Sequence, residues 1–126
     1  IASIVSPRLH TQLAGWLGSS AKVLVILGAL AAWLAVGTGE LAHDTVPHVP
    51  DAWEAQAEHE ESGELTAMAA TLYALWVLFG VPRVKNQSIL TGIELLACIA
   101  IVVLVTRTGY LGAKLVFHYG VAVQSN

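Results

Sequence analysis

The stretch VLVILGALAAWLAVGTG, from Val23 to Gly39, carries no charged residue and decides the fold of the chain. Two further stretches share its character: Leu65 to Val81 has no charge, and Ile89 to Thr106 has only Glu94. At about 1.5 Å per residue, each stretch would reach roughly 25 Å, close to the hydrocarbon thickness once flanking residues are added. We therefore predict three complete transmembrane helices, over about residues 20–39, 64–82 and 88–108.

The composition of the whole chain also points to a membrane. Of its 126 residues, 56% are hydrophobic and 12% are charged, with a mean hydropathy of +0.67. Soluble domains are only about 45–50% apolar. Core helices of a soluble bundle are the alternative, but such helices carry a polar stripe at the helical period, which these stretches lack. We predict an all-α integral membrane helical bundle that forms a single domain over residues 1–126.

The chain opens on a short apolar segment, Ile1 to Val5, and its only methionine is Met68. No secretory signal with a charged start, an apolar middle and a small-residue cleavage site is found in the sequence. We expect the opening segment to be the tail of an earlier helix, which would give the intact protein four spans.

Lysine and arginine residues indicate the orientation, because they gather in cytoplasmic loops near the ends of transmembrane helices. Arg8 and Lys22 precede the first complete span, and Arg83 and Lys85 lie between the second and third. The connection over residues 40–63 has neither residue type. We predict a multi-pass membrane protein, with the loop 40–63 and the C-terminus on the outer, periplasmic or extracellular, side. Eight carboxylates lie in or beside this outer loop: Glu40, Asp44, Asp51, Glu54, Glu58, Glu60, Glu61 and Glu64.

The outer loop should contain an acidic helical segment of its own. Asp51 can cap a helix, and Glu54, three residues later, completes a capping box. Ser62 and Gly63 interrupt this segment before the second span, either as a kink or as the start of a new helix.

Four of the five histidines should lie on the outer face of the membrane: His43, His48, His59 and His118. In the plainest interpretation they are solvated or hydrogen-bonded residues of an interface. In a second interpretation, His43, His48 and His59 hold a divalent metal with nearby carboxylates, although their spacing matches no standard zinc or copper motif. A third interpretation makes them haem ligands.

A haem b in a helical bundle needs two imidazoles that face each other from different helices at similar depth. His43 follows the first span and His59 precedes the second by a similar margin, so both would lie near the outer boundary. His118 would reach them if a turn after Gly109 made residues 109–120 an interfacial segment. Two of these three histidines would then bind haem b and exchange electrons with a periplasmic cytochrome.

Glu94 is a carboxylate in the interior of the third predicted span, and ionisable residues are rare within a bilayer. It lies a short way inside the inner boundary, and Lys22 lies at the inner end of the first complete span. We expect a structural ion pair between Lys22 and Glu94, with a proton-relay role for Glu94 as the alternative.

The C-terminal stretch GYLGAKLVFHYGV, from Gly109 to Val121, is similar to the ending GGxLVYxHGV of a bacterial four-helix membrane family, the domain of unknown function 2231. The GTG of residues 37–39, the histidine before the second span at His59 and the spacing of the helices agree with this family. The resemblance covers nearly the whole chain. It implies a four-helix fold whose first helix, with an HPxxVHFP-like start, is missing here, and it implies no activity, because none is settled for the family.

The sequence contains no Gly-rich phosphate loop, nucleophile elbow or zincin helix. The net charge of −3 and the lack of a basic patch exclude a nucleic-acid partner. Small residues such as Gly28, Ala70 and Gly92 permit close helix approach, and lipid-facing surface remains for a larger membrane partner. We therefore predict an accessory or structural transmembrane subunit of a larger membrane complex, with no catalytic activity of its own. Haem-linked electron transfer is the alternative.

Overall fold

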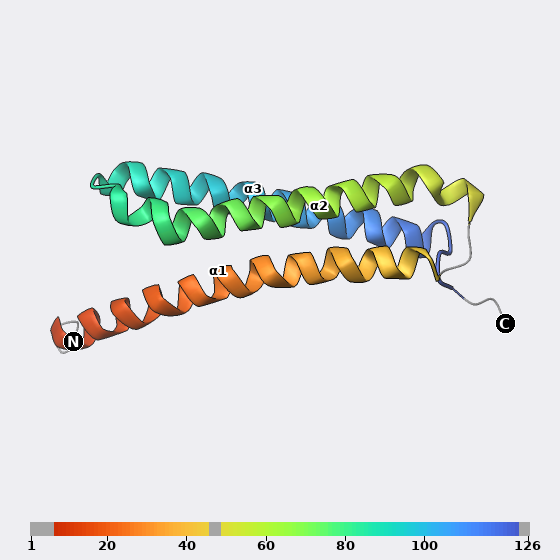
Figure 1. Cartoon of the computed structure of the whole chain (residues 1–126). Coiled ribbons are helices and arrows are strands. Elements are labelled where there is room, and N and C mark those ends of the chain that lie inside the picture. The colour runs from red at the N-terminus through yellow and green to blue at the C-terminus, as the bar shows by residue number, and fades with distance from the viewer. Residues whose placement is uncertain (1–6, 46–48, 124–126) are drawn as a thin grey trace, which may run out of the picture.

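The computed structural model describes residues 7–45 and 49–123, which form three long antiparallel helices (Figure 1). Helix α1 spans Pro7–His43, α2 spans Trp53–Leu75 and α3 spans Gln87–Phe117. Short elements connect them: η1 (Pro50–Ala52) leads into α2, and η2 (Trp76–Gly80) and η3 (Val81–Arg83) lie between α2 and α3. These two ranges contain no strand, so the predicted all-α fold is confirmed.

Three helical stretches are long and apolar enough to cross a membrane: Gly15–His43 with 29 residues, Pro50–Arg83 with 34 and Gln87–Phe117 with 31. About 20 residues suffice for the hydrocarbon core. Large apolar side chains on all three helices are exposed, as Leu34 (70%), Leu72 (69%) and Leu96 (69%) illustrate. In a bilayer this surface faces acyl chains, which are as apolar as leucine.

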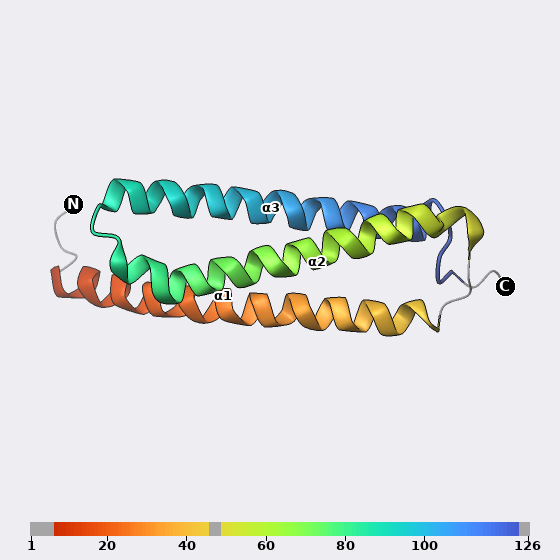
Figure 2. The same cartoon turned by 45° about the horizontal axis from the view of Figure 1, so that its top comes forward.

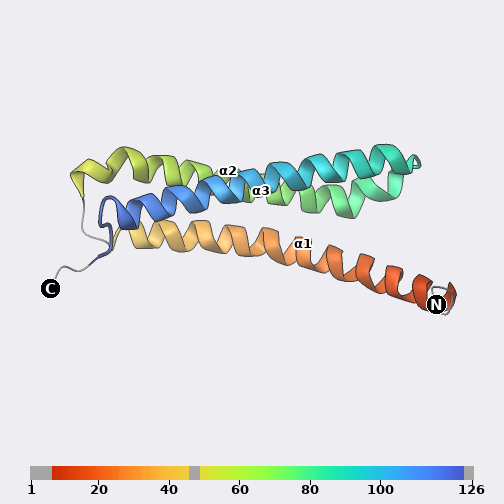
Figure 3. The same ribbon diagram turned by 180° about the vertical axis from the view of Figure 1, so that it is seen from behind.

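Helix α2 lies between the other two helices, as Figure 2 shows. Helix α1 packs on α2, and α2 packs on α3, whereas α1 and α3 make little direct contact. Toward its N-terminus α1 diverges from the α2–α3 hairpin, which Figure 1 and the view from behind in Figure 3 both show. In the C-terminal half of α1, Trp33 Nε1 donates a hydrogen bond to Thr71 Oγ1 of α2 at 2.9 Å.

The two ends of the bundle differ in charge. Helix α1 ends, α2 begins and α3 ends at one end of the bundle, which we call the acidic end because Glu40, Glu54 and Glu60 lie there. The opposite end holds Arg83 and Lys85, and we call it the basic end.

A small apolar core closes the acidic end. Gly120, with a φ of 67°, turns the chain back after α3, and a positive φ suits glycine because it has no Cβ. The Val121 N–H then donates to the Leu115 carbonyl at 3.0 Å. The turn thereby packs on the start of α2. Ala52, Ala55 and Leu115 are the buried residues of this core, and Val49, Tyr119 and Val121 pack against them.

Two sequence features that predict breaks lie inside continuous helices. Helix α2 runs through Ser62 and Gly63, so the acidic segment and the second span form one helix, and the connection shrinks from residues 40–63 to 44–49. Helix α3 runs through Gly109 to Phe117, so residues 109–120 do not form a separate interfacial segment. The reason is tertiary packing, because contacts with neighbouring helices outweigh the weak helix propensity of serine and glycine.

At the basic end, α2 passes through the π-helical turn η2 before the connection to α3. The indole ring of Trp76 packs so closely on Gly80 that no side chain fits at that position. Helix α3 then begins at Gln87, where the Asn86 side chain accepts hydrogen bonds from the N–H groups of Ser88 (3.0 Å) and Ile89 (3.3 Å). This N-cap satisfies two donors that the first turn of a helix leaves free.

Candidate functional site

Three hydroxyl side chains, which we call the hydroxyl cluster, join α2 to α3 toward the acidic end: Ser62, Thr66 and Thr108. Ser62 is only 1% exposed, and its Oγ lies 2.8 Å from Thr108 Oγ1. Thr66 Oγ1 donates to the Ser62 carbonyl at 2.7 Å, and Thr108 Oγ1 lies 3.0 Å from the carbonyls of Ser62 and Leu104. All three hydroxyl protons therefore have acceptors. The cluster holds the helices together without leaving an unsatisfied polar group.

His59 lies beside this cluster with its ring fixed in one orientation. Its Nδ1 is 3.1 Å from the backbone carbonyl oxygen of Thr108. A carbonyl only accepts, so Nδ1 carries the proton and donates it, and Nε2 of the neutral ring is left as an acceptor or metal ligand. Gly112 makes room for the ring, because a Cβ at that position would lie 3.0 Å from His59 Cε1.

His43, the last residue of α1, contacts α2. Its Nδ1 lies 2.6 Å from Glu60 Oε1, which makes an ion pair when the imidazole is protonated. The Gln56 side-chain nitrogen lies 2.7 Å from the same ring nitrogen and, because an amide nitrogen only donates, it bonds Nδ1 in the alternative state in which Nδ1 carries no proton. These contacts tie the end of α1 to the first turns of α2, at an exposed position.

A cavity of about 250 Å³ lies among the three helices at this end. Carboxylates line it on two helices, Glu40 on α1 and Glu60 and Glu64 on α2, and His59 lines it as well. The remainder of its described lining is small or apolar except for two hydroxyls: Ala32, Ala35, Val36, Gly39, Gly63, Thr66 and Thr108. The site therefore combines acidic groups and an oriented imidazole with an apolar wall.

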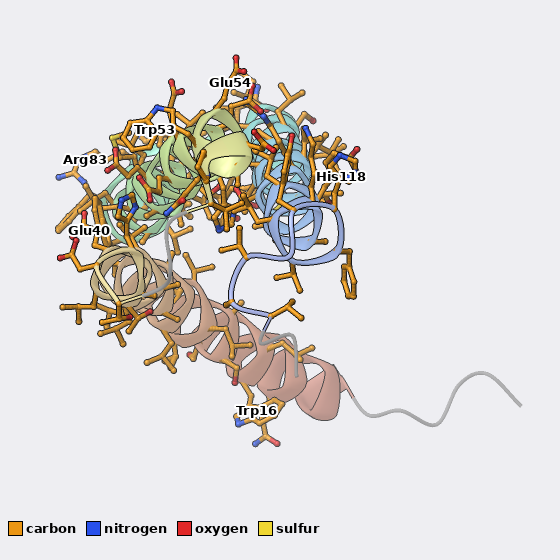
Figure 4. All side chains as sticks on the ribbon, turned by 90° about the vertical axis from the view of Figure 1, so that its right-hand side faces the viewer. Trp16, Glu40, Trp53, Glu54, Arg83 and His118 are labelled. Atoms are coloured by element: carbon orange, nitrogen blue, oxygen red, sulfur yellow. The ribbon has the colours of Figure 1, made fainter. Side chains whose placement is uncertain are left out.

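His118 lies outside the described lining of the cavity. It lies just after α3, is exposed, and its ring meets Tyr119 edge-on at 4.8 Å between ring centroids. Seen from the acidic end, Glu40 and His118 lie on opposite sides of the bundle (Figure 4). Because α3 does not turn at Gly109, nothing directs His118 toward the cavity.

The predicted metal site and the predicted Lys22–Glu94 ion pair are not found among the described residues. Within residues 7–45 and 49–123, no group of three or more His, Cys, Asp or Glu side chains is arranged to hold a metal ion. His48, the third predicted metal ligand, lies outside the described residues. In the same ranges the ion pair that forms joins His43 to Glu60, and Lys22 and Glu94 are not paired. The helices explain this, because Lys22 is on α1 and Glu94 on α3, with α2 between them.

The hydroxyl cluster and the close approach of Gly112 to His59 were not predicted from the sequence. Ser62 and Thr66 are four residues apart and therefore share one face of α2, which is a usable signal for an interhelical contact. Thr108 and Gly112 show the same spacing on α3. Two such pairs on neighbouring helices would have predicted the contact that the structure contains.

These features define a multi-pass α-helical membrane protein with a polar contact at one end of its bundle. The chain belongs to a family of predicted membrane proteins, DUF2231, whose family model matches residues 7–125. The predicted resemblance is thus confirmed. No curated protein and no solved structure matches the chain.

The C-terminal motif that carries the resemblance has a structural role in this chain. Leu111 and Leu115 are buried, and Gly112 lies against His59. Gly120 supplies the positive φ of the turn, and Val121 closes it onto Leu115. The motif therefore packs the end of α3 onto the start of α2.

Proposed function

We propose that the protein is an accessory or structural transmembrane subunit that packs within a larger membrane complex. The observation that carries this proposal is the position of α1, which diverges from the hairpin toward the basic end (Figures 1 and 3). Two exposed glycines of α1 lie in this part with no atom of another helix near the position of a Cβ: Gly15 and Gly18.

The face of α1 that meets the hairpin at the acidic end continues into this unpacked part. Val36 approaches α2, since a Cβ at Gly63 would lie 3.9 Å from its Cγ2. Gly18 is eighteen residues earlier, which is five helical turns, so it shares the face of Val36. Transmembrane helices associate through close contact at small residues. A helix of another subunit could pack on the face of α1 that contains Gly18.

The charge distribution supports an orientation with the acidic end facing the periplasm of a bacterial inner membrane. Arg83 and Lys85 flank the turn at the basic end, and no lysine or arginine occurs from Glu40 to Pro82. Positive residues in short loops favour the cytoplasmic side.

Native mass spectrometry of the protein purified in mild detergent tests the subunit proposal. We expect an assembly with a second kind of chain in fixed ratio, which Gly18→Leu disrupts because the new side chain blocks close approach. Gly37→Leu is the matched control, since Gly37 also has open space around its Cβ position but belongs to the acidic half of α1. If the unchanged protein, Gly18→Leu and Gly37→Leu were all found as a single chain, the result would contradict the proposal.

Haem-linked electron transfer is the second candidate, and the two oriented histidines favour it. His59 donates from Nδ1 to a backbone carbonyl and keeps Nε2 for a ligand, and His43 does the same toward Glu60 in the tautomer that carries its proton on Nδ1. Ligating histidines are usually oriented in this way. The two would hold haem b near the acidic end, with a periplasmic cytochrome as the partner.

A reduced-minus-oxidised absorption spectrum of the purified protein tests this candidate. Haem binding predicts a Soret band that His59→Ala abolishes and His118→Ala leaves intact, because His118 lies away from the cavity. A spectrum without a Soret band, or one that both variants preserve, would reject it.

A further inference from the structure

The cavity at the acidic end has a graded lining. Along α1 the lining changes from Ala32 to Glu40 over eight residues, which corresponds to about 12 Å. Val36 and Gly39 lie between them. A ligand that fills this space would meet apolar atoms at its inner end and carboxylates at its outer end.

The polar groups of the cavity are almost entirely acceptors. The carboxylates of Glu40, Glu60 and Glu64 accept, and so does His59 Nε2, because the ring proton is on Nδ1. The hydroxyls of Thr66 and Thr108 give their protons to backbone carbonyls. No lysine or arginine is found in the described lining. A complementary ligand must therefore donate hydrogen bonds.

The charges of the cavity favour a cation. Glu60 is paired with His43, whereas the described residues offer no ion-pair partner to Glu40 or Glu64. On α1 and α2 the surroundings of the cavity are acidic, because no lysine or arginine occurs from residue 40 to 82, and the cations of this end, Arg107 and Lys114, are on α3 outside the described lining. A metal ion fits poorly, because the described side chains form no group of three ligands. An organic ammonium ion needs only one or two carboxylates and donates several hydrogen bonds.

We propose that this cavity binds a small lipophilic amine in its protonated form. The ammonium group donates to Glu40 and Glu64, and the hydrocarbon body lies against Ala32 and Val36. A volume of about 250 Å³ limits the ligand to one ring or a short alkyl chain. This inference is independent of the subunit proposal, which concerns the opposite half of α1.

Equilibrium dialysis of the protein in nanodiscs of uncharged lipid tests the proposal with phenethylamine as the probe. The neutral 2-phenylethanol has a similar shape and measures partitioning into the nanodisc. We expect saturable binding of the amine and none of the alcohol. Glu64→Gln should weaken amine binding about tenfold, as loss of a charged hydrogen-bond partner does. Glu58→Gln, an exposed glutamate of α2 outside the lining, should leave it unchanged.

A second pair of variants tests the cavity without changing charge. Gly39 lines it and has open space around its Cβ position, so Gly39→Leu should fill the cavity and abolish binding. Gly37→Leu adds the same side chain outside the lining and should bind normally. Circular dichroism and gel filtration would show that all four variants keep the helical fold. Equal uptake of amine and alcohol, or amine binding that survives Gly39→Leu, would overturn the proposal.

Discussion

The acidic half of the bundle and the basic half of α1 are held in different ways. Toward the acidic end, hydrogen bonds join all three helices, through the hydroxyl cluster, His59 and the contact of His43 with Glu60. Beyond the Trp33–Thr71 bond, the described residues of α1 make no polar contact with the hairpin, and α1 diverges from it. The acidic half of the bundle is therefore held by contacts within this chain, whereas the basic half of α1 has the exposed face that we propose for a partner helix.

The hydroxyl cluster should produce the largest effect on this comparison. Thr108→Val keeps the shape of the side chain but removes the acceptor of the Ser62 hydroxyl, which is buried. We expect the free energy of unfolding in mixed detergent micelles to fall by about 2 kcal/mol. Thr106→Val is the control, because Thr106 Oγ1 bonds only the Val102 carbonyl of its own helix. If both variants lost the same free energy of unfolding, the hydroxyl cluster would not stabilise the contact between α2 and α3.

Gly112 and Gly109 offer a test in which the two results have opposite signs. A Cβ at Gly112 would press on the His59 ring, so Gly112→Ala should destabilise the protein by about 1 kcal/mol. Nothing lies within 4 Å of the corresponding position at Gly109, so Gly109→Ala should stabilise it by up to about 1 kcal/mol through better helix propensity. The same unfolding titration measures both. Stabilisation by Gly112→Ala would mean that His59 does not need this close approach.

The Trp33–Thr71 bond should have a smaller effect. Trp33→Phe removes the indole N–H that donates to Thr71. Interhelical hydrogen bonds in bilayers average about 0.6 kcal/mol, and we expect a loss of that size. Trp16→Phe, at a position that is 67% exposed, serves as the control in the same unfolding titration and should be neutral. If the two substitutions had equal effects on the free energy of unfolding, the bond would not hold α1 to α2.

The His43–Glu60 contact should matter least. Both side chains are exposed, and exposed ion pairs contribute little because water and salt screen them. Glu60→Gln should lower the melting temperature only slightly at low salt, and the difference from the unchanged protein should vanish at high salt. A large loss that persists at high salt would assign this contact a greater role than its exposure suggests.

The sequence was sufficient for the three spans, because charge-free runs such as Val23 to Gly39 report directly on the solvent around them. It also placed His43 and His59 near the same end. The sequence-based prediction was wrong at residues that can either end a helix or pack inside one. Ser62 and Gly109 have weak helix propensity and predict breaks, yet the helices continue through both. At Ser62, which is buried, packing against α3 overrides the local propensity.

The predicted ion pair between Lys22 and Glu94 was wrong for a different reason. Lys22 and Glu94 were expected to pair because both lie near one boundary, but depth alone does not say which helices are neighbours. With α2 in the middle of the bundle, α1 and α3 make little direct contact. The cavity could not be predicted from the sequence either, because its lining residues come from three separate helices.

We propose that α1 is held by the hairpin at the acidic end and is open to a partner helix at the basic end. Pulsed electron paramagnetic resonance between spin labels on exposed residues measures this directly in the isolated protein. One pair, Leu41 with Leu65, reports on the acidic half, and the other, Leu17 with Phe79, reports on the basic half. We predict a narrow distance distribution for the first pair and a broad one for the second. Equally narrow distributions would contradict the claim.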